Sequence, residues 1–507
     1  MVGALFNKIS KYGNPKDTGL SEDNRIGVVD IGSNSVRLVV FDAPARLPVP
    51  IFNESIECRL GKGLGQTGLL NPGGTDLAMR TLGRFTRLAR EMRVTSFVLV
   101  ATAAVREAHD GGIFTQEVKK RFGYSIRVLS GDEEARLAAL GVLGGSPEVK
   151  GIAGDLGGGS LDLISLEKGS FGKSDTLPLG HIRVSEDSNR NLKKARNLVA
   201  QNFNSISWLS SCPGLSFYAI GGAWRAIARL YIEQTKYPLH VLDNFTISFE
   251  EALSFTSLIG GFSAKSLKKM GTIALQRSNS LPFAAIVLNN LIKISQPKEI
   301  IFSGYGLREG LFHELLTKEM REKDPLIGAC EGFALRSGRF STHGEEIVSW
   351  LAPLFEGETK DFYRIFHASA LLSDIGWTEH PDYQAIHSFM RVLRLPISGI
   401  SHRQRTMLAF TVYARYNGKQ KQYDVRQVKD ILVKKDQGRA SMMGMALRFA
   451  YLISGGAPEI LPSVSLKIYN KNLELRVGRL DRDLVSESVE KLFYELASTL
   501  DLFGKIK

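Results

Sequence analysis

One sequence pattern occurs twice in the chain, as IGVVDIGSNSVRLVVFD at residues 26–42 and as IAGDLGGGSLDLISL at residues 152–166. In each copy a run of aliphatic and β-branched residues ends in aspartate, a glycine-rich turn follows, and a second apolar run returns beside the first. A single turn of this kind is a weak signal. Two of them, each at the start of a region in which strands and helices alternate, predict a duplicated α/β fold.

Both turns carry groups that suit a phosphate ligand. Glycines let backbone N–H groups approach a phosphate closely, Ser and Asn side chains add donors, and the preceding aspartate can hold Mg²⁺ or a water bound to it. The candidates are Asp30, Gly32, Ser33, Asn34 and Ser35 in the first turn and Asp155, Gly157, Gly158, Gly159 and Ser160 in the second. For either turn alone, the alternative is an ordinary hairpin whose glycines serve only its backbone geometry.

The segment between the turns adds further candidates. Apolar side chains at helical spacing predict a helix over 77–92, and a strand over 97–101 leads to Arg106. Arg106 therefore follows a strand end, where ligands of α/β sheets usually bind. After a strand over 125–129, three acidic residues at 132–134 begin a helix, and on spacing alone they are explained by the helix dipole.

The composition is typical of a globular protein with more than one core. The chain has 507 residues, 43% of them hydrophobic, and single cores stop growing at about 250–300 residues, so two to four domains are expected. Three widely spaced cysteines exclude a disulfide framework, which predicts a reducing, cytoplasmic location. Residues 1–24 are expected to form a disordered leader, and no apolar run is long enough to span a membrane.

The net charge of +13 is unevenly distributed. Residues 401–450 hold eleven basic and three acidic residues, a local excess of +8. This excess indicates contact with a polyanion, although a solvated helix face is the commoner explanation of a short basic run. Tyrosines interleave with the basic residues, so nucleic-acid binding is a further alternative.

Six segments together resemble the signature of the exopolyphosphatase/guanosine-pentaphosphate phosphohydrolase (Ppx/GppA) family. In order, they are DIGSNSVRLVV, ATAAVREA, LSGDEEARLAALG, DLGGGSLDL, AIGGAWRAIA and SGYGLREGL. The resemblance implies two ribonuclease-H-like α/β domains of the actin/sugar kinase/Hsp70 superfamily, facing across a cleft. We expect them at residues 25–140 and 141–315.

The resemblance also implies roles for the matching positions. Glu134, the second glutamate of GDEEA, would be the general base that activates water. Arg106 matches an arginine that binds the terminal phosphate. Arg277 matches a second cleft arginine, but the acidic residue that often follows it is absent here.

Magnesium is the cofactor that the resemblance implies. Asp155 matches the family's metal-associated aspartate, and Asp162 stands seven residues later, where the family usually has glutamate. Asp30 of the first turn completes the set of candidate ligands. The side chain of Asp162 is one methylene shorter than glutamate, so its role in positioning metal or water does not follow from the resemblance alone.

A kinase or ATPase of the same superfamily is the main competing class. The segment AIGGAWRAIA, residues 219–228, resembles the superfamily's adenosine motif in its paired glycines. Trp224 and Arg225 follow immediately, and the resembled family generally does not use this pocket for ATP. The alternative is a glycine turn that opens a packed helix.

Beyond residue 315 we expect a helical HD-like domain at 316–435 and a small α+β unit at 436–507. The segment FHASALLSDIGWTEHPDYQAIHSFM, residues 366–390, is similar to HD-domain hydrolases, but its pair reads Ser-Asp rather than His-Asp. The candidate metal ligands His367, Asp374, His380 and His387 are therefore not expected to form a dinuclear centre, with a residual metal site as the alternative.

The function that the resemblance implies is Mg²⁺-dependent, processive release of orthophosphate from the end of inorganic polyphosphate. Lys434, Lys435 and Arg439 would hold the distant part of the chain. The alternative substrate is guanosine pentaphosphate, with (p)ppGpp as substrate or inhibitor in the stringent response, and the alternative class is a weakly catalytic sensor of nucleotides or nucleic acid. A homodimer is expected, whereas a membrane or nucleic acid is not an expected partner.

Overall fold

The computed structural model describes residues 25–42, 45–270, 278–340, 342–418 and 423–507. The chain forms two units, of which the first ends at Glu322 and the second begins at Lys323. The predicted leader and the candidate Arg277 lie outside the described residues. In the described part, no helix is long and apolar enough to cross a membrane.

The first lobe of the first unit is a five-stranded sheet in the order β3-β2-β1-β4-β5. Its strands are β1 (Arg25–Ile31), β2 (Val36–Phe41), β3 (Pro50–Ile56), β4 (Val94–Ala101) and β5 (Ile126–Val128). Strands β1 and β2 are antiparallel, whereas β1 and β4 are parallel. Helices α2 (Pro72–Glu91) and α4 (Gly111–Phe122) pack on one face through a shared apolar core.

The second lobe repeats this plan in a six-stranded sheet, β10-β11-β9-β6-β7-β8. The strands are β6 (Lys150–Leu156), β7 (Leu161–Glu167), β8 (Ser170–Leu177), β9 (Ser216–Ile220), β10 (Phe245–Ser248) and β11 (Glu299–Phe302). Hairpin β6-β7 pairs in parallel with β9, as hairpin β1-β2 pairs with β4. The main helices on one face are α6 (His181–Asp187), α7 (Leu192–Phe203), α8 (Gly222–Thr235), α9 (Phe249–Ile259) and α12 (Leu281–Ser295). The prediction of a duplicated α/β fold is confirmed.

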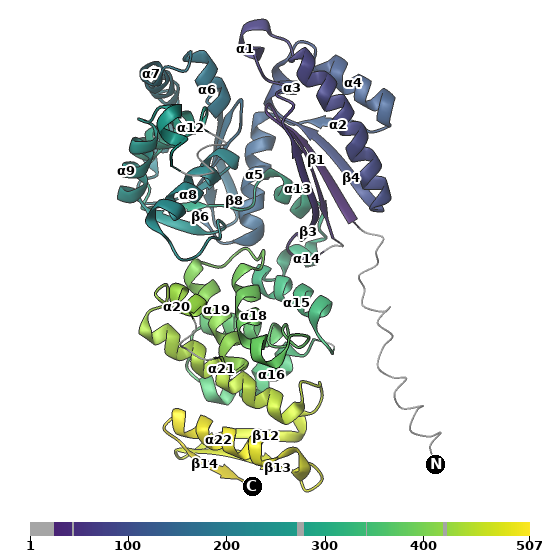
Figure 1. Cartoon of the computed structure of the whole chain (residues 1–507), viewed down its shortest axis with the longest axis vertical. Coiled ribbons are helices and arrows are strands. Elements are labelled where there is room, and N and C mark those ends of the chain that lie inside the picture. Colours follow the sequence, from purple (N-terminus) through teal and green to yellow (C-terminus); the bar gives the residue numbers. More distant parts are fainter. Residues whose placement is uncertain (1–24, 43–44, 271–277, 341, 419–422) are drawn as a thin grey trace. The chain divides into compact units, whose positions relative to one another are not determined.

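Two helices, α5 (Gly131–Gly145) and α13 (Leu307–Leu315), pack against each other between the sheets (Figure 1). Small residues allow the contact, because a Cβ on Gly310 would lie 1.8 Å from the carbonyl oxygen of Leu137. Apolar residues of α5 enter the cores of both lobes. The start of α5, where the predicted base lies, is thereby fixed between the two lobes.

The second unit is helical up to residue 454 and then becomes α+β. Its longer helices are α15 (Pro325–Ser337), α16 (Gly344–Leu351), α17 (Lys360–Leu371), α18 (Pro381–Arg394), α19 (His402–Arg415) and α21 (Lys434–Ser454). Strands β12 (Val464–Tyr469), β13 (Asn472–Val477) and β14 (Phe503–Ile506) form a sheet in that order, with α22 (Glu487–Thr499) before the last strand. Helix α21 runs without a break across the expected boundary at 435/436, so the α+β part begins at β12.

Candidate active site

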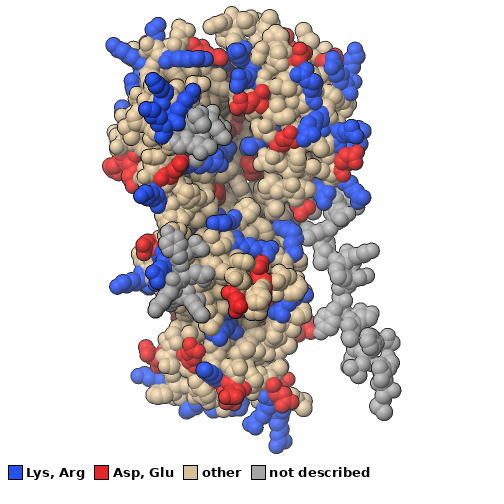
Figure 2. All heavy atoms as spheres, viewed as in Figure 1, with Lys and Arg blue, Asp and Glu red and all other residues tan. Residues whose placement is uncertain are grey.

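The two predicted turns have the same internal geometry and lie against each other. In the first, the N–H of Gly32 donates to the carbonyl of Ser35 at 2.9 Å, and in the second Gly157 donates to Ser160 at 3.0 Å. A Cβ on Gly159 would come within 2.9 Å of Ser33 Oγ, so the turns of the two lobes are in close contact. Figure 2 shows the hollow between the lobes, with acidic side chains inside it.

Beside the turns lies a cavity of about 320 Å³ with a polar and charged lining. Ser33 and Asn34 contribute to it from the first turn, and Arg59, Lys62 and Arg190 add basic side chains. Glu57 and Glu186 also line the cavity, but its hydroxyl, amide and basic donors are suited to binding phosphate oxygens. The predicted phosphate-binding character of the first turn therefore has a matching space in front of it.

Glu134 reaches the site because its neighbour occupies the cap of helix α5. The side chain of Glu133 accepts a hydrogen bond from the N–H of Ser130, and Ser130 Oγ accepts one from the N–H of Glu133, which forms a capping box. Glu133 also pairs with Arg127 on the surface. Glu134, one residue later, points inward and is only 7% exposed.

Arg106 is the direct partner of Glu134. It lies on the short helix α3 (Ala103–Glu107), which follows β4, and its Nη1 donates to Glu134 Oε2 at 2.9 Å and to the carbonyl of Leu129 at 2.8 Å. This contact brings together the predicted base and the predicted phosphate-binding arginine. Burial raises the pKa of Glu134 well above its usual range, and the carboxylate of Asp162 adds to the effect, whereas Arg106 opposes it.

Asp155 and Asp162 stand opposite each other in the β6-β7 hairpin. Asp162 is 2% exposed and accepts hydrogen bonds from Ser160 Oγ at 3.0 Å and Thr176 Oγ1 at 2.8 Å, which fix its short side chain. Burial raises the pKa of Asp155 to about 6 and that of Asp162 to about 7. Burial likewise raises the pKa of Asp30 at the end of β1.

This donor set fits a hard divalent cation. Burial raises the pKa of both carboxylates, and the charge of Asp155 raises that of Asp162 further, so a positive ion beside them is favourable. Mg²⁺ is usually held by one or two carboxylates together with water and phosphate oxygens. Among the described residues, no group of three or more His, Cys, Asp or Glu is arranged to enclose a metal by itself. These carboxylates therefore fit an ion whose remaining ligands are oxygens of a bound phosphate.

A group of arginines behind the turns was missed by sequence reasoning. Arg37, Arg225, Arg229 and Arg308 line a second cavity of about 680 Å³, in which these four cations outnumber the carboxylates of Glu233 and Glu309. Burial, with the charges of Arg308 and Arg225 beside it, lowers the pKa of Arg37 to about 10. Arg225 is anchored by donating to the carbonyls of Ser303 and Gly304. Crowded guanidinium groups of this kind favour a multiply charged anion as ligand.

One of these arginines could have been found from the hairpin pattern. Register pairs Asp30 of β1 with Arg37 of β2, a consequence of the predicted turn between them. The paired glycines of the adenosine-like motif, in contrast, open helix α8. Trp224 in that motif is fully buried and donates its indole N–H to the carbonyl of Ala284, as expected for a packed helix.

Much of the predicted basic segment is engaged within the second unit. Arg405 is 1% exposed and donates to the carbonyls of Leu395 and Ile397. Arg439 forms an ion pair with Glu358. Lys434 and Lys435 are exposed at the start of α21. That they hold the distant part of polyphosphate stays a prediction. On the face drawn in Figure 2, basic side chains are interspersed with acidic ones.

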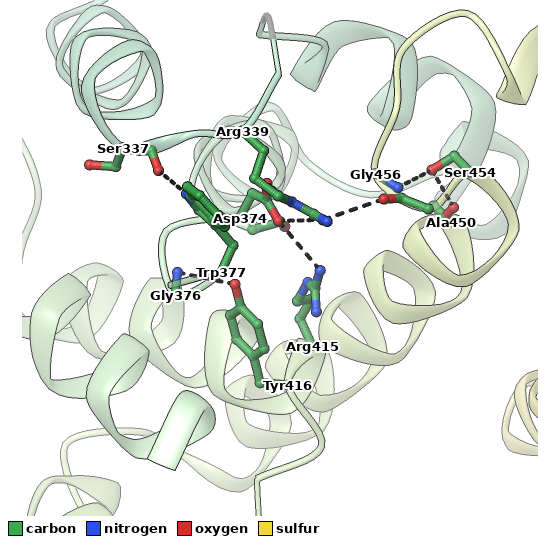
Figure 3. A network of polar contacts seen from close by, with 12 residues as sticks. Ser337, Arg339, Asp374, Gly376, Trp377, Arg415, Tyr416, Ala450, Ser454 and Gly456 are labelled. Atoms are coloured by element: carbon green, nitrogen blue, oxygen red, sulfur yellow. Dashed lines mark hydrogen bonds and ion pairs between the residues drawn. The ribbon is translucent and has the colours of Figure 1, made fainter. Parts of the chain in front are cut away.

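Residues 366–390, for which a degenerate HD-like site was expected, include Asp374, which is the centre of an arginine network (Figure 3). Arg339 donates to both carboxylate oxygens of Asp374, at 2.8 and 2.9 Å, and Arg415 Nη2 lies 3.9 Å from the same carboxylate. The guanidinium of Arg415 stacks between Tyr416 and Tyr451, 4.2 Å from each ring centroid. Two guanidinium groups thus compensate the carboxylate that an HD site would offer to a metal.

Comparison with known proteins gives two adjoining family matches. The model of the Ppx/GppA phosphatase family matches residues 39–319, and the model of the exopolyphosphatase C-terminal region matches residues 326–505. A crystal structure of an exopolyphosphatase from Cytophaga hutchinsonii covers 58% of this chain and 97% of its own, at 21% identity and a TM-score of 0.53. That likeness supports the two-lobed α/β fold.

Among curated proteins, exopolyphosphatase 1 of Mycobacterium tuberculosis is 31% identical over 166 residues, which are 32% of this chain and 48% of that protein. A guanosine-5'-triphosphate,3'-diphosphate pyrophosphatase of Photobacterium profundum is 22% identical over 75% of this chain and 78% of its own. Retrograde regulation protein 2 of Saccharomyces cerevisiae is 26% identical over 79% of this chain and 74% of its own. The relatives thus include two enzymes with different names and one protein named as a regulator.

Proposed function

Because the chain belongs to the Ppx/GppA phosphatase family, we propose that it is an exopolyphosphatase that releases orthophosphate from the end of inorganic polyphosphate. The observation that carries the proposal is the contact between buried Glu134 and Arg106, beside two glycine turns in contact. The match of residues 326–505 to the exopolyphosphatase C-terminal model favours polyphosphate over other phosphate esters and anhydrides.

The reaction is a phosphoryl transfer to water. In such reactions the transition state is loose and its charge is spread over the equatorial oxygens, so positioning and charge neutralisation account for most of the catalysis. Arg106 binds the terminal phosphate through guanidinium donors that Glu134 does not use. The carboxylate of Glu134 accepts a proton from the attacking water, and its raised pKa brings it closer to the range in which a carboxylate is an effective base.

Asp30, Asp155 and Asp162 are the residues that would hold Mg²⁺. When bound, the ion supplies positive charge that neutralises phosphate oxygens. Ser160 and Thr176 hold Asp162 in place by hydrogen bonds, which offsets the shorter reach of aspartate compared with glutamate at this position. The N–H groups of the glycine turns supply the remaining donors to the phosphate chain.

The second candidate substrate is guanosine pentaphosphate. The arginine-lined cavity behind the turns favours it, because a guanosine nucleotide with phosphates at both ends needs charge compensation at a second place. The pyrophosphatase of Photobacterium profundum matches over three quarters of this chain, which supports the same choice. We further propose that the helical part of the second unit, from Lys323 to the end of α21 at Ser454, is an HD-like domain without a working metal centre and that the chain acts as a homodimer.

Phosphate release from long-chain polyphosphate and from guanosine pentaphosphate, at equal concentrations of chain ends, separates the candidates. We expect faster release from polyphosphate, and gel analysis of partial digests should show full-length chains beside free phosphate because the enzyme is processive. A uniform ladder of shortened chains would contradict processivity. Faster release from guanosine pentaphosphate would favour the second substrate, and binding of both without turnover would favour a sensor.

A further inference from the structure

The three-stranded sheet of the second unit has one face that no described helix covers. Helix α22 packs on the other face (Figure 1). On that face Leu466, Leu473 and Leu475 are buried, as is Phe493 of α22. Side chains alternate between the two faces along a strand. The uncovered face therefore presents Lys467 and Tyr469 from β12, Asn472 and Arg476 from β13, and Phe503 and Lys505 from β14. Glu474, which is only 4% exposed, lies on the same side of β13.

Two aromatic rings are exposed on this face. Tyr469 is 65% exposed and Phe503 is 72% exposed. Both are in register with Asn472 on the central strand, so they form one row across the sheet with their backbones about 10 Å apart. A solvent-facing sheet surface normally carries polar residues, so two aromatic side chains in one row need a partner to explain them.

The rest of the face is basic. Lys467 and Lys505 flank Glu474 in the next row, and neither forms an ion pair with a residue that the structure describes. Lys507 and Arg476 donate to Glu474 at 2.6 and 2.8 Å, and these bonds lower its pKa to about 2. The carboxylate in the middle of the face is thus compensated, and the lysines beside it are free to bind an anion.

We propose that this face binds single-stranded nucleic acid, with bases stacked on Tyr469 and Phe503 and phosphates held by Lys467 and Lys505. Base stacking on aromatic side chains next to basic groups is the usual chemistry of single-strand recognition. Polyphosphate has no rings and would leave both aromatic side chains in water. A duplex keeps its bases stacked inside and offers no faces to these rings.

The test is fluorescence anisotropy of a labelled single-stranded RNA of about 12 nucleotides, and a DNA of the same sequence, with the full chain. Replacing both rings, Tyr469→Ala with Phe503→Ala, should weaken binding by about tenfold for each ring, roughly a hundredfold in all. Lys467→Gln with Lys505→Gln should weaken binding and reduce its salt dependence. Tyr383→Ala removes a similarly exposed ring from α18 and should leave binding unchanged.

Both double variants should retain the wild-type melting temperature and rate of phosphate release from polyphosphate, because the replaced side chains are exposed. Absence of RNA and DNA binding by the wild type at low salt would overturn the proposal. Unchanged binding in the aromatic double variant, or preference for a duplex, would also overturn it. The proposal would fail as well if sedimentation showed that the wild type is a dimer and the aromatic double variant a monomer. The last result would identify the face as a contact between two copies of the chain.

Discussion

The guanidinium of Arg106 donates a hydrogen bond of 2.9 Å to the carboxylate of Glu134, and both side chains are largely shielded from water. The bond couples the predicted base to the predicted phosphate-binding residue. It also sets the ionisation of the base, because Arg106 lowers a pKa that burial and Asp162 raise. Changes at either residue should therefore appear in the pH dependence of the reaction as well as in its rate.

Replacing Arg106 should shift the acid side of the pH-rate profile. Without the guanidinium, the pKa of Glu134 rises further, so Arg106→Gln needs a higher pH to form the carboxylate that accepts the proton. We expect kcat/KM to fall by about two orders of magnitude and the acid limb to move to higher pH. Arg127→Gln, which removes a surface partner of Glu133, is the control. An acid limb in the same place in both variants would contradict the coupling.

The ionised form of Asp162 should destabilise the folded protein, because the carboxylate is buried. Its pKa is raised from 3.8 to about 7, so its contribution is most favourable below pH 3.8 and is lost as the pH rises through about 7. With metal removed by EDTA, Asp162→Asn should raise the melting temperature at pH 8 relative to the wild type and much less at pH 4. A lower melting temperature of the variant at pH 8 would show that its hydrogen bonds outweigh the cost of burial.

Mg²⁺ should stabilise the protein and be required for phosphate release. A ligand that binds only the folded state raises the melting temperature with its concentration. We expect this rise in the wild type, its loss in Asp155→Asn, and its retention in Asp132→Asn, whose carboxylate accepts a hydrogen bond from Ser174 outside the carboxylate group of the site. EDTA should abolish turnover of the wild type. An equal rise in the Asp155 variant would remove that residue from the metal site.

The exposed lysines at the start of α21 should matter mainly for long substrates. Lys434→Gln with Lys435→Gln removes two positive charges that can hold distant phosphates, so the apparent KM for long polyphosphate should rise several-fold while that for short chains changes little. Lys119→Gln with Lys120→Gln removes the same charge from the exposed end of α4. Equal effects on long and short chains would contradict a role of these lysines in holding the distant part of polyphosphate. Arg439 is left unchanged because it pairs with Glu358.

Local patterns were sufficient for the turns and for the helix that carries the base. The aspartate-glycine turns follow from a local pattern, two apolar runs around a short glycine-containing turn, and the same closing hydrogen bond appears in both lobes. The position of Glu134 also follows locally, since Glu133 completes a capping box and the next residue must point elsewhere. The contact of Glu134 with Arg106 needed the resemblance, because helix α3, which carries Arg106, and helix α5 are separate elements with helix α4 and strand β5 between them in the sequence.

The arginines behind the turns show where sequence reasoning ends. Arg37, Arg225 and Arg308 come from three separate segments, and only the packed lobes bring them to one cavity. The count of basic residues at 401–450 was misleading because it did not include the groups that pair with them. Arg405 and Arg439 contribute to the excess of +8, but their partners, backbone carbonyls and Glu358, lie in segments that a local count does not include.

The most direct test of the account is single-turnover phosphate release from polyphosphate by Glu134→Gln, compared with Glu133→Gln. Loss of a general base lowers the rate by at least about a hundredfold, and we expect that loss in Glu134→Gln with the affinity for polyphosphate retained. Glu133→Gln keeps an acceptor for the helix cap and should release phosphate at nearly the wild-type rate. Near-normal turnover in Glu134→Gln would show that Glu134 is not the base.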